Sequence, residues 1–276
     1  MNYDAEVVEF RVPTENNKTL FICGILPTFS EAYIYGSLWN IFSGFGALYW
    51  LKVVPNATVA LPGFYAIVKF YSAVQASRAQ ESTHAKGLFQ KSPLKVQLCT
   101  RQSSNGFHNV KSLSVSKCQE LANYYLGFNG WTSRVITLKN ISDSDTGELQ
   151  VNADSQKPAL KYGCVVGLNF PHHGVACRGV GIAEEVFEGS PGVQEVAIKR
   201  GLLPKRARDR AMMDAFRKVL LIVLGNGRVV VDCKLDADEI TSDEDLEGMI
   251  KVNNVSWGTE DDEDFPDLTL NLSDLS

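Results

Sequence analysis

Two apolar stretches, residues 18–26 (KTLFICGIL) and 63–70 (GFYAIVKF), determine what the first hundred residues can fold into. Each is short, rich in β-branched and aromatic residues and bounded by polar residues, glycine or proline, as buried strands are. Helical and strand patterns alternate around them, which predicts the order β-α-β-β-α-β of a split ferredoxin-like fold. The predicted elements span 18–26, 34–45, 48–54, 64–70, 72–81 and 94–98.

The first helix has a predicted start signal. Thr28 and Glu31 have the spacing of a capping box, in which a hydroxyl and a carboxylate satisfy backbone donors at a helix start. Apolar residues then follow at helical spacing as far as Phe45. The uncharged run 32–51 is long enough to span a bilayer, but its glycines and its change from helical to strand pattern argue against a membrane span.

The two apolar strands resemble the ribonucleoprotein motifs of the RNA recognition motif (RRM) family. Residues 20–25 (LFICGI) are similar to the hexamer, with Phe21 at its second position, and residues 63–70 to the octamer, with Tyr65 at its third. The resemblance implies that both rings point outward from the centre of the sheet. Bases stack on such rings for about 1–3 kcal/mol each, whatever the base.

The octamer departs from the family pattern at Gly63, Phe64 and Ile67, which removes one phosphate contact and one stacking ring. Three nearby cations are expected to compensate: Lys52, Lys69 and Lys95. Two interpretations therefore stay open for this face. It binds nucleic acid, or another protein covers the rings.

The second half is predicted to be a separate α+β domain. A polar linker at 101–112 precedes a short helix at 116–125 and a tight turn, GFNGW, at 127–131. A strand follows at 134–141, then a polar loop at 142–159 and a hairpin with strands at 162–170 and 175–186.

A long basic helix is predicted at 205–224, with Pro204 in its first turn. The 3.6-residue repeat places Arg206, Arg210 and Arg217 within roughly 40° of one another, opposite an apolar side. Residues 199–228 contain nine Lys or Arg and two Asp or Glu. This excess of one sign favours contact with a polyanion over an ordinary solvated face.

Residues 118–131 (CQELANYYLGFNGW) are similar to the signature of the RAD52 family of single-strand annealing proteins, and the hairpin and helix extend the match over 113–235. The resemblance implies a β-β-β-α layer that binds DNA and assembles into rings. The family's basic groove pair falls on Arg217 and Lys218, and a third groove arginine falls on Leu221. That contact is lost, so annealing and ring formation do not follow.

Other motifs are weak. Cys164, His172, His173 and Cys177 are close in sequence, but two of them lie at a hairpin tip and one on a strand, so zinc is not expected. The pair Gly179 and Gly181 lacks the third glycine of a dinucleotide site. We expect no catalytic residue, no metal and no cofactor.

The acidic end of the chain differs in kind from the rest. The net charge of −5 averages a basic body with a tail, 236–276, that holds fourteen acidic residues and one lysine. Its last part, DFPDLTLNLSDLS, alternates leucines with polar residues. The tail is predicted to be disordered up to Asp264, and it is a solubilising segment, a docking peptide or a polyanion mimic that competes for the basic face.

Together these patterns predict an α+β protein with an RRM at 15–100, a linker at 101–112, an annealing-protein-like domain at 113–235 and a tail at 236–276. The resemblances imply a nuclear protein with a cytoplasmic pool that binds single-stranded DNA and RNA in the DNA damage response. They also suggest a homo-oligomer and a protein partner for the tail. The competing interpretation is an adaptor whose RRM sheet and tail hold protein partners. Neither interpretation is an enzyme.

Overall fold

The computed structural model describes residues 5–99, 111–142, 150–151, 158–187 and 192–234. It has mixed α+β structure with antiparallel sheets, which confirms the predicted class at that level. Most of the predicted linker, most of the loop 142–159 and the whole tail 236–276 lie outside the described residues. Across the described ranges, every helix is too short or too polar to cross a membrane.

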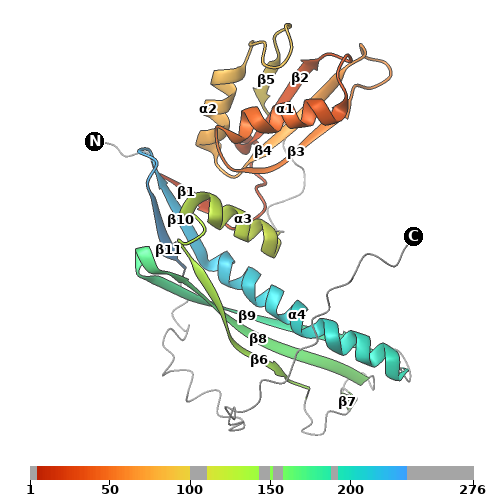
Figure 1. The fold of residues 1–276 in the computed structure, drawn as a ribbon, viewed down its shortest axis with the longest axis vertical. Coiled ribbons are helices and arrows are strands. Elements are labelled where there is room, and N and C mark those ends of the chain that lie inside the picture. Colours follow the sequence, from red (N-terminus) through yellow and green to blue (C-terminus); the bar gives the residue numbers. More distant parts are fainter. Residues whose placement is uncertain (1–4, 100–110, 143–149, 152–157, 188–191, 235–276) are drawn as a thin grey trace, which may run out of the picture. The chain divides into compact units, whose positions relative to one another are not determined.

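The first sheet carries two helices on one face (Figure 1). Its elements are η1 (Asn16–Lys18), β2 (Thr19–Ile25), α1 (Glu31–Ser43), β3 (Leu48–Pro55), β4 (Phe64–Phe70), α2 (Ala73–Thr83) and β5 (Lys95–Leu98). The strands are antiparallel in the order β3-β4-β2-β5. The face against the helices is fully apolar and includes Leu20, Ile22, Leu51, Ala66, Val68 and Val96.

Helix α1 begins two residues later than a cap at Thr28 would require, so the predicted capping box is wrong. Ser30 is the N-cap, with an extended backbone, and its Oγ accepts a hydrogen bond from the Tyr33 amide at 3.3 Å. A cap must lie directly before the first helical residue, Glu31, for its oxygen to reach the third amide of the helix. Thr28 is two residues too early.

A second sheet joins residues near the start of the chain to residues 219–233. Strand β1 (Ala5–Glu9) pairs with β10 (Val219–Leu224), which also pairs with β11 (Val229–Cys233). The segments that enter and leave the first α/β unit run together, because the Val12 amide donates to the Lys111 carbonyl at 2.9 Å. The elements from η1 to β5 are therefore inserted between β1 and its partner strand β10. The sequence pattern had assigned no element to β1.

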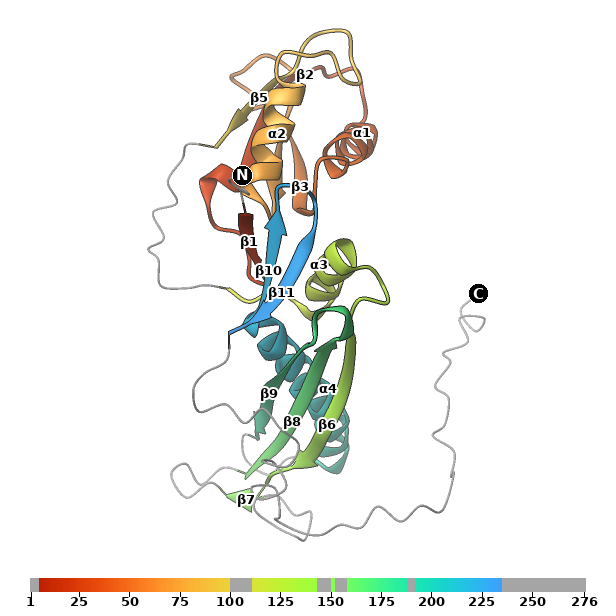
Figure 2. The same cartoon turned by 90° about the vertical axis from the view of Figure 1, so that its left-hand side faces the viewer.

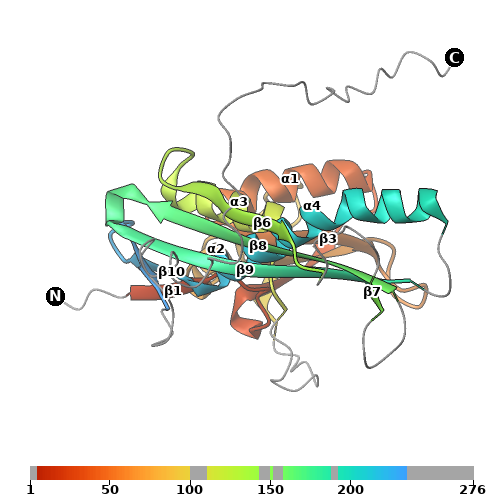
Figure 3. The ribbon, with the colours of Figure 1, turned by 90° about the horizontal axis from the view of Figure 1, so that it is seen from below.

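The third sheet and its helices make up the rest of the described structure. They are α3 (Val115–Leu126), β6 (Thr132–Asn140), β7 (Gln150–Val151), β8 (Pro158–Phe170), η2 (Pro171–His173), β9 (Val175–Val186) and α4 (Val193–Lys218). Strand β8 is central, with β6 and β7 along one edge and β9 along the other. Helix α4 lies along one face of this sheet, as the views in Figures 2 and 3 show.

The predicted helix 205–224 is wrong at both ends. Helix α4 begins at Val193, contains Pro204 in its interior and ends at Lys218, and the next six residues form β10. Residues 219–224 (VLLIVL) are apolar throughout, so their periodicity cannot distinguish a helix from a buried strand. Residues 219–224 form a strand because they pair with β1 on one side and with β11 on the other. The turn at 225–227 accordingly connects two strands.

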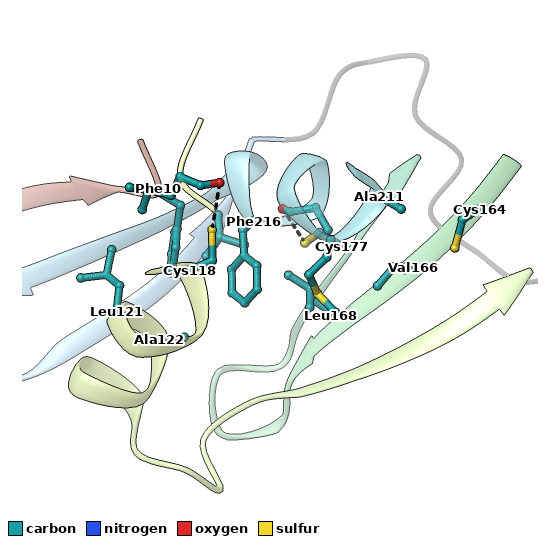
Figure 4. Close-up of a cluster of buried hydrophobic side chains, with 14 of the residues drawn as sticks. Phe10, Cys118, Leu121, Ala122, Cys164, Val166, Leu168, Cys177, Ala211 and Phe216 are labelled. Carbon is teal, nitrogen blue, oxygen red and sulfur yellow. Dashed lines mark hydrogen bonds between the residues drawn. The ribbon is translucent and has the colours of Figure 1, made fainter. Parts of the chain in front are cut away.

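The glycines of β9 allow α4 to lie directly on the sheet. A Cβ at Gly181 would lie 2.2 Å from the Ala207 oxygen and 2.2 Å from the Ala211 nitrogen, and one at Gly179 would be equally close to Ala211 and Ala215. Figure 4 shows the small and apolar side chains that fill this contact and its surroundings. The glycine pair thus serves close helix packing, which is a structural reason for a motif that resembled part of a nucleotide site.

Candidate nucleic-acid interface

The face of the first sheet that points away from α1 and α2 carries the two predicted stacking rings. Neighbours of Phe21 along β2 are buried against the helices, so Phe21 itself points the other way and is 37% exposed. Phe21 lies directly opposite Ile67 on β4, and Tyr65 is two residues further along the same face. The ring centroids of Phe21 and Tyr65 are 5.4 Å apart, at an interplanar angle of 34°. The structure therefore brings the two rings together.

The three lysines predicted to assist them are not equivalent. Lys52 and Lys95 are exposed and lie on β3 and β5, the two outer strands of the sheet. Lys69 instead donates a hydrogen bond from Nζ to the Pro13 carbonyl at 3.0 Å. Burial lowers the pKa of Lys69, against the opposing effect of the Glu15 carboxylate. Lys69 is tied to the chain that enters the sheet, so Lys52 and Lys95 are the cations best placed for phosphate.

Trp50 is a third ring on the same face, and the sequence analysis missed it. It lies opposite Lys69 in the pairing of β3 with β4, and directly opposite residues of an antiparallel pair share a face. Trp50 is half-buried. Alternation along β3 was the available signal, because buried Leu51 and Val53 bracket Lys52 and so place Trp50 on the lysine's side.

On α4, two of the predicted basic residues bind the open edge of β9. Arg210 donates from Nη1 to the Ile182 carbonyl at 2.5 Å, and Lys218 donates from Nζ to the Arg178 carbonyl at 2.8 Å. Residues four apart on a helix rise about 6 Å, close to the repeat of two residues on a strand. Because Gly179 and Gly181 let α4 approach β9 closely, side chains spaced along the helix can reach backbone groups spaced along the strand edge.

Carboxylates interleave with these cations. Asp214 accepts a hydrogen bond from the Val180 amide on the same edge at 3.1 Å, and its other oxygen pairs with Arg217 at 2.9 Å. Arg206 pairs with Glu185 of β9 at 3.0 Å. The surface around these cations is therefore of mixed sign, because Glu185 of β9 lies beside the helix in addition to Asp214 on α4 itself. The Arg217 side chain is 65% exposed and the Arg206 side chain is 55% exposed, whereas Lys218 is only 18% exposed.

The position of the lost groove arginine lies in a core. Leu221 belongs to β10, is fully buried, and lies opposite Val8 of β1 and Val231 of β11. A charged side chain at this position would have no access to solvent.

The cysteines near the hairpin face the core as well. Cys164 and Cys177 are both buried beneath α4, and the Cys177 thiol lies 3.6 Å from the Ala215 carbonyl oxygen. In the part of the chain that the structure describes, no three His, Cys, Asp or Glu side chains group as metal ligands would.

Curated proteins are similar to this chain over nearly its whole length. RAD52 motif-containing protein 1 of Danio rerio is 55% identical over 257 residues, covering 93% of this chain and 91% of the relative. The proteins of the same name from Gallus gallus and Homo sapiens are 44% and 40% identical, each covering 96% of this chain and at least 95% of their own length.

The chain belongs to the RAD52 motif-containing protein 1 family. A family model described as "RDM1 DSRM domain" matches residues 113–220, from just before α3 into β10. Among solved structures, "Structure of Mip6 RRM3 Domain" covers 32% of this chain and 98% of its own, at 14% identity and a TM-score of 0.26.

Proposed function

We propose that this member of the RAD52 motif-containing protein 1 family binds single-stranded nucleic acid, DNA or RNA, on the uncovered face of an RRM at residues 15–100. The observation that carries the proposal is the pair of rings, Phe21 and Tyr65, 5.4 Å apart on the two central strands of the β3-β4-β2-β5 sheet. Aromatic side chains at such positions stack on bases regardless of sequence.

The expected affinity combines stacking with phosphate contacts. Two rings contribute about 2–6 kcal/mol in total, at about 1–3 kcal/mol per stacked base. Lys52 and Lys95 flank the rings on the outer strands, so the backbone of a bound strand can pass over a cation at either edge. Each phosphate contact adds a term that weakens as salt rises.

A second contact on α4 supports binding along the phosphate backbone, to single strands and to duplex DNA. Arg217 and Arg206 are the residues best able to leave their carboxylate partners for a phosphate, because exposed ion pairs contribute only about 0–1 kcal/mol. Arg210 and Lys218 would first have to give up backbone carbonyl partners on β9.

The family name supports a role in the DNA damage response or recombinational repair. The proposal places this role in the nucleus, with a cytoplasmic pool. The chemistry proposed is binding alone, without catalysis or a cofactor. Self-association into a homo-oligomer is compatible with this role and is part of the proposal for the domain at 113–235.

Fluorescence anisotropy of labelled oligonucleotides tests the proposal directly. Phe21→Ala and Tyr65→Ala should each weaken binding by about 5- to 150-fold, the equivalent of 1–3 kcal/mol. Tyr35→Ala is the matched control, because that exposed ring stacks on Trp39 of α1, on the other side of the sheet. If Phe21→Ala and Tyr65→Ala bound both DNA and RNA as tightly as Tyr35→Ala does, binding on this face would be refuted and the adaptor interpretation favoured.

A further inference from the structure

The outer face of the β6-β8-β9 sheet is the face that points away from α4. Cys164, Val166 and Leu168 of β8 are buried in the core that α4 covers, so the residues between them point the other way. Residues of β6 and β9 that lie directly opposite those positions share this outer face. Figure 2 looks onto it with α4 behind the strands, and none of the helices that the structure describes lies over it.

The outer face is aliphatic on β9, where the open side of an antiparallel sheet is usually polar. Val180 and Ile182 are 54% and 52% exposed. They lie opposite Val165 and Gly163 of β8, which places them on the outer face. Both side chains therefore contribute little to the core of this chain, and exposed aliphatic residues gathered on one face indicate an interaction surface.

The glycines of β8 make this aliphatic surface continuous from β9 to β6. A Cβ at Gly167 would lie 3.3 Å from Ile136 Cδ1, and a Cβ at Gly163 would lie 3.4 Å from Ile141. The two isoleucine side chains therefore lie over the glycines of the central strand, and Ile141 is 43% exposed there. Aliphatic atoms thus extend across all three strands.

Positive charge lies on both sides of the aliphatic surface. Among the residues of β6, β8 and β9 that share the outer face, four are cations and one is an acid: Arg134, Lys139, Lys161, Arg178 and Glu184. Lys161 pairs with Glu184 at 3.2 Å. The remaining cations lie on β6 and β9, the two strands that flank β8. An occupant of this face should therefore be apolar in the middle and acidic at its sides.

We propose that the outer face binds an acidic amphipathic helix of a partner protein. Such a helix has an apolar stripe with charged residues on either side of it, which matches aliphatic residues between strands that carry cations. A second copy of this chain is disfavoured, because a two-fold interface would bring the same cations to face one another. Nucleic acid is disfavoured because the outer face of β6, β8 and β9 has no aromatic ring on which a base could stack.

Fluorescence anisotropy of a labelled synthetic helix, titrated with the full-length protein, tests the proposal. The probe is about 18 residues long, so that it is helical on its own, with a leucine stripe flanked by glutamates. Its twin has lysine at every glutamate position. We expect the acidic probe to bind at least about tenfold more tightly than the twin, and Val180→Ser combined with Ile182→Ser to weaken that binding by about tenfold. Lys139→Glu should reduce the difference between the two probes.

The matched control combines Val193→Ser with Ile198→Ser on α4, where the same two residue types are 89% and 58% exposed. All four side chains are more than half exposed, so neither double variant is expected to prevent folding. Equal binding of the two probes, or equal binding of the acidic probe by the two double variants, would overturn the proposal. A dimer in sedimentation that dissociates in the Val180 and Ile182 variant would also overturn it, because the occupant would then be a second copy. Loss of oligonucleotide affinity in that variant would assign the face to nucleic acid instead.

Discussion

Replacing Gly181 with alanine should separate α4 from the sheet. The new methyl group would lie 2.2 Å from two backbone atoms of the helix, the Ala207 oxygen and the Ala211 nitrogen, and neither can rotate away. Overpacking typically costs about 1–3 kcal/mol, and a clash with backbone belongs at the upper end, about 3 kcal/mol. Alanine also lowers the conformational entropy of the unfolded chain, which stabilises the folded protein by about 0.4–1 kcal/mol. The net destabilisation is therefore about 2 kcal/mol.

Urea and thermal unfolding measure this change, with Gly163→Ala as the matched control. Gly163 lies on the neighbouring strand β8, where a methyl group would meet only the flexible Ile141 side chain at 3.4 Å. We expect Gly181→Ala to lower Tm by about 4–8 °C, from about 2–4 °C per kcal/mol in a body of this size, and Gly163→Ala to change it little. Equal stability of the two variants would refute the close contact between α4 and β9.

Three further predictions test separate parts of the structure. Ser30→Ala should lower the free energy of unfolding by about 1 kcal/mol because it removes an N-cap, whereas Thr28→Ala should leave urea unfolding unchanged. The reverse result would show that Thr28 is the cap. Asp214→Ala should cost about 1–2 kcal/mol, because the Val180 amide loses a carboxylate acceptor, and an unchanged unfolding midpoint would show that solvent replaces it. Burial raises the pKa of the Cys118 thiol from 9.0 to about 12, so stability should fall as pH rises above about 9, where the thiol ionises only in the unfolded chain. Cys118→Ala should remove that component of the pH dependence in urea titrations at pH 8 to 11, and an unaltered slope would contradict it.

Local pattern was sufficient for elements whose partners are near in sequence. The resemblance of β2 and β4 to the ribonucleoprotein motifs implied one face for Phe21 and Tyr65, and the structure sets their centroids 5.4 Å apart. Alternation along β3 would also have found Trp50.

What local pattern could not supply depends on distant segments. Strand β1 is five residues long and is defined by its pairing with β10, more than two hundred residues away. The end of α4 is ambiguous in the sequence because residues 219–224 are apolar on every side.

The roles of Arg210 and Lys218 could not be foreseen for the same reason. Both reach carbonyls of β9 only because Gly179 and Gly181 let the helix approach. Spacing along one helix showed which cations share a face, but it carried no information about the strand edge that they bind.

Photo-crosslinking of a bromouracil-containing single strand to the full-length protein, followed by peptide mapping, tests the central claim most directly. Stacking on the RRM face predicts crosslinks at Phe21 and Tyr65, and their loss in the corresponding alanine variants. Crosslinks confined to α4, or retained in full after both rings are removed, would contradict the account.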